Sequence, residues 1–105
     1  MDKFKKYIGK TVNTEKIKDF KFLQNCGLYC ERIPDDLSEF EEIEFTIDNI
    51  VMCVAILEGK IKRIMLVKVD SSEPDACSPL NREELEEFLK KNEEKLITFF
   101  ENIIS

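Results

Sequence analysis

The chain has 105 residues, 43% of them hydrophobic and 36% charged, with a formal net charge of −6 at pH 7. This length predicts one domain over residues 1–105 with a single hydrophobic core, and the patterns described below predict that it is an α+β domain. The negative charge opposes direct binding to nucleic acid phosphates and to anionic lipid surfaces.

The residue types that the chain lacks exclude much catalytic chemistry. There is no histidine, the commonest general base near neutral pH and the partner of serine and cysteine nucleophiles. Gly9, Gly27 and Gly59 are too far apart to form a phosphate-binding loop. The sequence therefore predicts a protein that is not an enzyme and that holds no cofactor and no metal ion.

The N-terminal residues are charged and lack the apolar stretch of a secretion signal, and the longest apolar run, Ile50 to Leu57, is too short for a membrane span. We expect a cytoplasmic protein without membrane contact, in which the cysteines are reduced. Cys26 and Cys30 are the only closely spaced pair of cysteines. A thiol-dependent or metal-binding role for this pair is an alternative to small, buried thiols.

In the first third of the chain, Phe4, Tyr7 and Ile8 predict a short helix that ends at Gly9. Residues 13–33 fit two structures, because their apolar residues suit a helix that ends at Gly27 and also a hairpin that turns there. The following residues, 34–40, fit either a short helix or an acidic loop.

The middle third has the pattern of an antiparallel β-meander of at least three strands. Apolar and polar residues alternate over 43–47, residues 50–57 are apolar on both faces, and residues 61–69 form the third strand. A two-residue turn at 48–49 and another turn at 58–60 set the register. This register assigns to one face Ile43, Phe45, Ile47, Ile50, Met52, Val54, Ile56, Met65, Val67 and Val69.

The opposite face of this predicted sheet is also too apolar to be left exposed. We expect the N-terminal segment to cover it, or else a second copy of the chain, which would make the protein a homodimer. The residues assigned to this face are Val51, Cys53, Ala55, Leu57, Ile64 and Leu66.

The last third predicts a long helix over residues 82–103 that packs on the first face of the sheet. Asn81 and Glu84 have the spacing of a capping box, and Leu80 and Leu85 that of a hydrophobic staple. Asn92 lies on the apolar stripe, where we expect it to bind a core water or to mark an overhanging end.

Seven carboxylates lie within the fourteen positions from residue 35 to residue 48. One interpretation is a solvated face whose charge protects an edge strand from pairing. The other is a docking surface, since charge raises association rates and selects partners. The residues of this candidate surface are Asp35, Asp36, Glu39, Glu41, Glu42, Glu44 and Asp48.

These observations predict a non-enzymatic acidic module of the inhibitor or immunity type that docks a basic protein partner. The first alternative is an acidic mimic of nucleic acid that inhibits a nuclease or a DNA-binding protein. The second is the thiol-dependent or metal-binding protein that would use Cys26 and Cys30.

Overall fold

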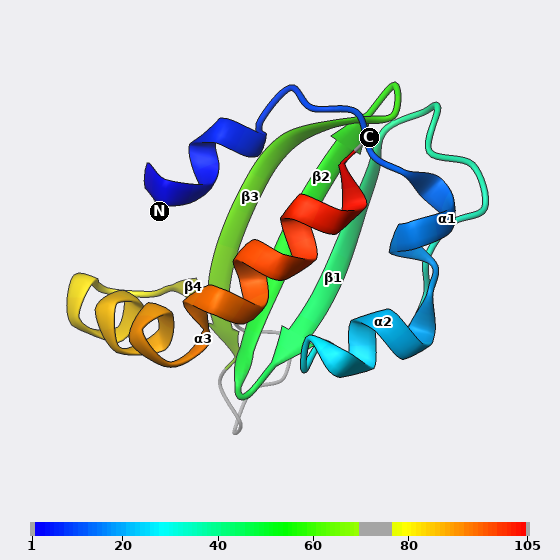
Figure 1. Ribbon diagram of the computed structural model, residues 1–105. Coiled ribbons are helices and arrows are strands. Elements are labelled where there is room, and N and C mark those ends of the chain that lie inside the picture. Colours follow the sequence, from blue (N-terminus) through cyan, green and yellow to red (C-terminus); the bar gives the residue numbers. More distant parts are fainter. Residues whose placement is uncertain (1, 70–76, 105) are drawn as a thin grey trace.

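The computed structural model describes residues 2–69 and 77–104, which contain an antiparallel sheet of four strands in the order β1-β2-β3-β4. The strands are β1 (Glu41–Ile47), β2 (Ile50–Leu57), β3 (Lys60–Val69) and β4 (Cys77–Pro79). The helical elements are the 3-10 helix η1 (Asp2–Tyr7), α1 (Thr14–Ile17), α2 (Phe20–Asn25) and α3 (Arg82–Ile103). The predicted α+β fold, a meander with a long C-terminal helix, is confirmed (Figure 1).

The β1–β2 hairpin has the register that the sequence predicts. Ile47 lies opposite Ile50, and Phe45 lies opposite Met52. Asp48 adopts a φ of 54° in the two-residue turn, a left-handed conformation that aspartate tolerates better than most residues. The short turn therefore sends the apolar residues of both strands to the same face.

The β2–β3 ladder contains a bulge that the sequence analysis does not anticipate. Ile56 pairs with Ile61, whereas Ala55 pairs with Arg63, so Lys62 is an extra residue without an opposite partner. Because side chains alternate between the two faces of a strand, one extra residue reverses the orientation of every residue that follows it.

This reversal corrects the predicted faces of β3. Ile64 and Leu66 pack against the hydrophobic core, and Met65, Val67 and Val69 lie on the opposite face. The prediction that Met65, Val67 and Val69 share the core face was wrong, because it counted a regular ladder through the turn.

The N-terminal segment packs on the same face of the sheet as α3. Figure 1 shows α3 lying across the sheet, with η1 on one side of it and α1 and α2 on the other. Phe4 and Tyr7 contact Phe100 of α3, with ring centroids 5.7 Å and 5.0 Å away. The expectation that residues 1–33 cover the opposite face was therefore wrong.

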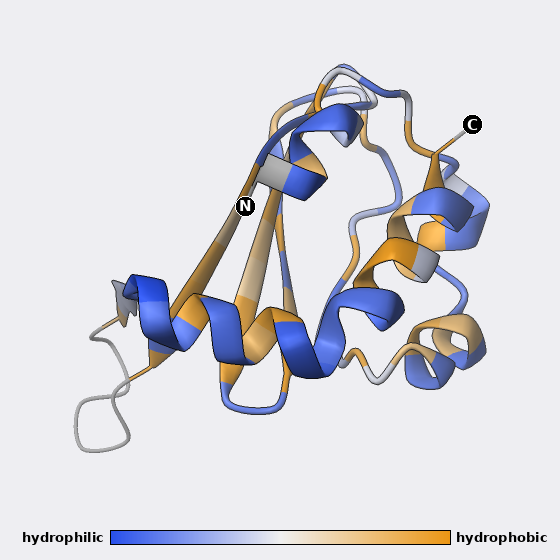
Figure 2. Cartoon of the chain, turned by 60° about the vertical axis from the view of Figure 1, so that its left-hand side comes forward, coloured by the Kyte–Doolittle hydropathy of each residue, from blue (hydrophilic) through white to orange (hydrophobic). Residues whose placement is uncertain are grey.

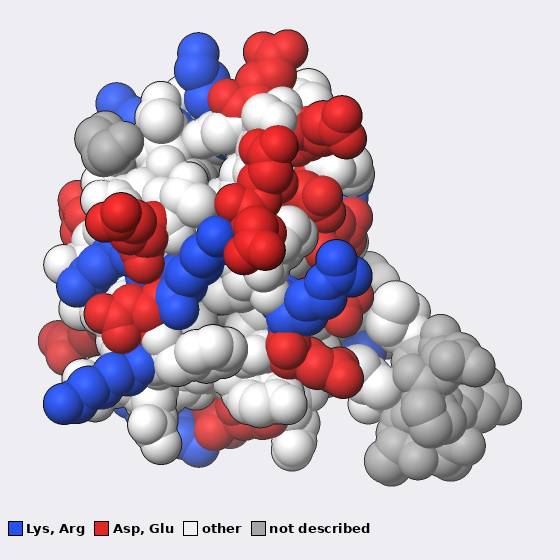
Figure 3. Space-filling model, turned by 90° about the vertical axis from the view of Figure 1, so that its right-hand side faces the viewer, with Lys and Arg blue, Asp and Glu red and all other residues white. Residues whose placement is uncertain are grey.

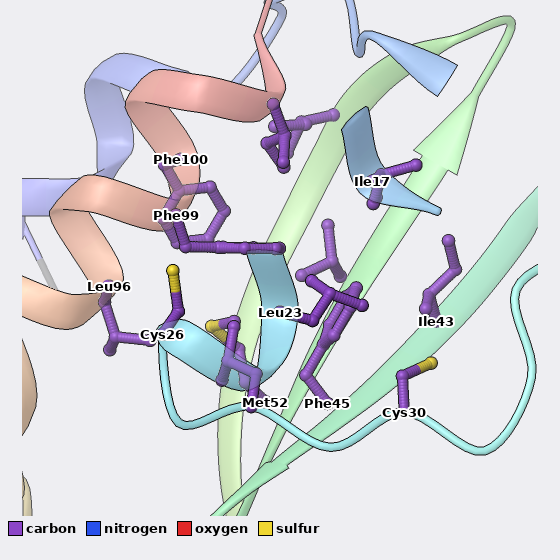
Figure 4. Packing of buried hydrophobic residues seen from close by; sticks show 14 of the residues in the cluster. Ile17, Leu23, Cys26, Cys30, Ile43, Phe45, Met52, Leu96, Phe99 and Phe100 are labelled. Carbon is purple, nitrogen blue, oxygen red and sulfur yellow. The ribbon is translucent and has the colours of Figure 1, made fainter. Parts of the chain in front are cut away.

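The core lies between this helical layer and the first face of the sheet. Leu23 of α2, Phe45 of β1 and Phe99 of α3 all meet there, and the rings of Phe45 and Phe99 are 5.0 Å apart in an edge-on arrangement (Figure 4). Such contacts join segments that are far apart in the sequence, so this core exists only once the chain has folded.

Residues 13–33 form two short helices and then an extended segment, in place of one helix or a hairpin. Asn13 caps α1 by accepting a hydrogen bond from the backbone of Lys16, and Asp19 caps α2 by accepting one from Phe22. Gly27 follows α2 with a φ of +74°, which explains why α2 ends there. Residues 34–40 form a loop, so the helical alternative was wrong for them.

Helix α3 begins with the predicted capping box, in which Asn81 and Glu84 each accept a hydrogen bond from the other's backbone N–H. Figure 2 shows apolar and polar segments alternating along α3, as expected for a helix with one buried side. Among the described residues, none of the helices has both the length and the hydropathy that a membrane crossing requires.

Candidate partner-binding surface

The seven predicted carboxylates do not form one surface. Glu41, Glu42 and Glu44 of β1 line a shallow hollow of about 290 Å³, which we call the acidic hollow. The full lining of the acidic hollow is Tyr29, Glu31, Arg32, Pro34, Glu41, Glu42, Glu44 and Thr46. Figure 3 shows the side of the molecule on which α1 and α2 lie beyond β1, and acidic side chains gather in the upper half of this view.

The other predicted acids lie elsewhere and mostly have partners within the chain. Asp35 is 3.2 Å from the Lys18 ammonium, and Asp36 accepts a hydrogen bond from the backbone N–H of Ser38. That hydrogen bond is the main reason why the pKa of Asp36 is lowered.

Asp48 lies beyond the other end of β1 and contacts α3. Its carboxylate accepts a hydrogen bond from Asn92 at 3.1 Å and lies 3.5 Å from Lys91 Nζ. Glu39 is exposed and lines neither the acidic hollow nor the hollow beside Asp35 and Asp36. The structure therefore brings together three of the seven predicted residues.

Glu31 joins the acidic hollow from a different segment and is not among the seven predicted residues. Tyr29 and Thr46 exchange two backbone hydrogen bonds, of 2.9 Å and 2.7 Å, which fix the segment after Tyr29 beside β1. Glu42 is 3.4 Å from Arg63, whereas Glu31, Glu41 and Glu44 form no ion pair with another described residue. These three carboxylates are therefore available to a cation from outside.

The carboxylates of the acidic hollow change the acidity of nearby thiols. Burial, followed by the charges of Glu42 and Glu44, raises the pKa of Cys53 to about 11. Burial also raises the pKa of Cys30. A backbone hydrogen bond with Arg32 lowers this pKa in part, and the charges of Glu44 and Glu31 raise it further. A negative potential therefore extends from β1 to its neighbours on both sides.

Cys26 and Cys30 are each only 4% exposed, and all four cysteines are free. Burial also raises the pKa of Cys26, so the reactive thiolate form of both thiols is suppressed near neutral pH. Within residues 2–69 and 77–104, no group of three or more cysteine, aspartate or glutamate side chains is arranged to hold a metal ion.

A second hollow, of about 430 Å³, adjoins the acidic hollow and shares Tyr29 with it. We call it the aromatic hollow, because Phe20 and Tyr29 on its rim are 68% and 66% exposed. The lining of the aromatic hollow is Phe20, Leu23, Gln24, Gly27, Leu28, Tyr29 and Cys30.

Comparisons of this chain with protein-family models, with curated proteins and with solved structures find no match.

Proposed function

We propose that the protein is a non-enzymatic binding module of the inhibitor or immunity type, which docks a basic protein partner on the acidic hollow. The observation that carries this proposal is the gathering of four glutamates around one hollow, three of them without an ion pair among the described residues. Charges in such a position steer an oppositely charged partner and raise its association rate.

The aromatic hollow supports the same proposal. Exposed aromatic side chains provide much of the binding energy in protein interfaces, and a polar rim commonly surrounds them. Tyr29 belongs to both hollows, so a partner that neutralises the glutamates would also cover an aromatic ring. The proposal includes a cytoplasmic location, where the four thiols would stay reduced.

The test compares two double charge reversals in the chain. Glu41→Lys with Glu44→Lys changes the acidic hollow, and Glu86→Lys with Glu87→Lys makes the same change in net charge on exposed positions of α3. A partner captured from the source cells by the immobilised chain is then purified, and its association rate is measured at low and at high salt.

We expect the hollow variant to associate at least about tenfold more slowly at low salt, and the α3 variant to associate at nearly the unmodified rate. The difference should shrink at high salt, because exposed charges are screened over about 8 Å at physiological ionic strength. Equal rates for both variants and the unmodified chain would show that the acidic hollow is not the docking site.

The same experiment separates the nucleic-acid mimic from the leading proposal, because the mimic requires the captured partner to be a nuclease or a DNA-binding protein. The thiol alternative has less support, since Cys26 and Cys30 are buried and their pKa values are raised.

A further inference from the structure

The outer edge of β1 has backbone groups that point away from the sheet. Thr46 exchanges its backbone hydrogen bonds with Tyr29, so the N–H and C=O of Thr46 face away from β2. In an antiparallel ladder this direction alternates along the strand, so the backbone groups of Glu44 and Glu42 face the same way. Among the described residues, no backbone hydrogen bond other than those of Thr46 joins this outer edge to another segment.

The chain's own neighbouring segment does not continue the pairing along this edge. Continued antiparallel pairing from the Tyr29–Thr46 bridge would place Glu31 directly opposite Glu44. Like charges directly opposite each other destabilise a pair of strands. The segment instead leaves β1 after the bridge, and the acidic hollow of about 290 Å³ lies between them.

We propose that an extended, basic segment of the partner adds to β1 as a further strand and fills the acidic hollow. This inference rests on the proposed function, and it specifies the form in which the basic partner is recognised. The partner's backbone would pair with the outward N–H and C=O groups of Glu42 and Glu44. Residues directly opposite these two would extend on the same face as their carboxylates, so lysine or arginine belongs there.

Charge selects this occupant over a second copy of the chain. Two β1 strands paired along their outer edges would bring the glutamates of one copy next to those of the other, which is unfavourable. A basic strand has the opposite effect, because Glu44 and Glu31 both gain a counter-charge. Since basic residues are needed only at every second position, the recognised segment alternates basic and uncharged residues.

The test uses a fluorescent peptide in which lysine and threonine alternate, measured against the full chain at low salt. In two further peptides the backbone nitrogens are N-methylated, either those of all lysines or those of all threonines. The lysine ammonium groups stay unmodified. In an added strand only one of these two sets of N–H groups faces β1, whichever direction the strand runs. A peptide of alternating glutamate and threonine controls for charge.

We expect the lysine peptide to bind, one methylated form to bind at least about tenfold more weakly, and the other to keep its affinity. We also expect binding to slow hydrogen exchange at the backbone amides of Glu42 and Glu44, measured by NMR. Glu44→Pro should weaken binding by a similar factor, because it removes an outward N–H at an edge position where proline is tolerated. Glu44→Gln, which keeps that N–H, is its matched control.

Equal binding of all three lysine peptides would overturn strand addition and leave the proposed function intact, since charge alone would then explain docking. Binding of the glutamate peptide as tight as that of the lysine peptide would overturn selection by charge. Absence of binding by every lysine peptide would overturn strand addition, and the charge-reversal experiment would then judge the proposed function separately. If Glu44→Pro does not fold, the comparison of the two methylated peptides still tests whether the segment adds to β1 as a strand.

Discussion

Asn92 is the one buried polar side chain among the described residues, and it joins α3 to the β1–β2 turn. It is 1% exposed, and its amide donates a hydrogen bond to the Asp48 carboxylate at 3.1 Å. The apolar spacing of the sequence predicts that Asn92 binds a core water or marks an overhanging end, whereas in the structure its partner is this carboxylate. The hydrogen bond is also the main reason why the pKa of Asp48 is lowered.

We expect Asn92→Ala to lower the free energy of unfolding by about 2 kcal/mol at neutral pH, since it removes a hydrogen bond to a charged group. A lowered folded-state pKa stabilises the protein above the unfolded-state value, and this stabilisation is lost as the pH falls through the folded-state value. In the variant, the pKa of Asp48 should therefore rise. The free energy of unfolding should also fall less between neutral and acidic pH than it does in the unmodified protein. Urea denaturation at neutral and acidic pH and an NMR titration of Asp48 measure both effects.

Lys91→Ala is the control for this variant, because it removes only an exposed charge 3.5 Å from the same carboxylate. We expect it to change stability by less than about 0.5 kcal/mol. An unchanged pKa for Asp48 in Asn92→Ala would contradict the assigned role of the hydrogen bond.

Tyr7 makes stability depend on alkaline pH. Burial, with a further contribution from its hydrogen bond to Glu101, raises the pKa of Tyr7 from 10.0 to about 12. Below pH 10 both folded and unfolded chains keep the hydroxyl protonated, and above it the unfolded chain ionises first. The stabilisation is therefore complete below the unfolded-state value and is lost as the pH rises toward 12.

We expect Tyr7→Phe to lose less stability than the unmodified protein when the pH is raised from 9 to 12. Denaturation curves over this range measure the difference. Tyr29→Phe is the matched control, since it removes the same group from a ring that is 66% exposed. Parallel loss of stability in all three proteins would argue against a role for Tyr7.

At the scale of elements, the bulge in β3 decides which side chains reach the core. Lys62 is the extra residue, and beyond it Ile64 and Leu66 face the core while Met65 and Val67 face away. The exposed side chain of Lys62 makes no contribution to the core. The position therefore matters for its backbone rather than for its side chain.

We expect deletion of Lys62 to destabilise the protein by about 3 kcal/mol or more, because a regular ladder would move Ile64 and Leu66 off the core face. Lys62→Ala keeps the backbone length and should change stability by less than about 0.5 kcal/mol. Urea denaturation followed by circular dichroism compares the two. A deletion variant as stable as Lys62→Ala would show that the core does not depend on the bulge.

At the scale of the whole molecule, both the N-terminal segment and α3 pack on one face of the sheet. The second face keeps apolar residues that are not part of the core cluster, among them Met65 and Val69, which are 36% and 42% exposed. The sequence predicts that either the N-terminal segment or a second copy of the chain covers this second face. Because the N-terminal segment packs on the first face, a second copy is the remaining candidate. It stays a prediction.

If two copies pair through this second face, sedimentation equilibrium should give a mass that rises with protein concentration toward that of a dimer. Met65→Lys with Val69→Lys should then restore the monomer mass, because charged residues would be buried at the contact. A monomer mass for the unmodified chain at all concentrations would contradict the dimer.

The sequence by itself determined the parts of the fold that depend on neighbouring residues. The Asp48–Asn49 turn sets the β1–β2 register, and Asn81 with Glu84 starts α3, because turn and cap geometry act over a few positions. Three glutamates of the acidic hollow were predicted for the same reason, since Glu41, Glu42 and Glu44 follow one another on a single strand.

Only the tertiary structure decided the remaining features. The bulge at Lys62 is favoured by the packing of Ile64 and Leu66 against distant segments, which no local pattern reports. The N-terminal residues could have packed on either apolar face, and contacts such as that of Tyr7 with Phe100 select one of them. Glu31 reaches the acidic hollow through the bridge between Tyr29 and Thr46, seventeen positions apart in the sequence. Local propensities act along the chain, whereas packing and charge act through space, and the candidate site depends on both.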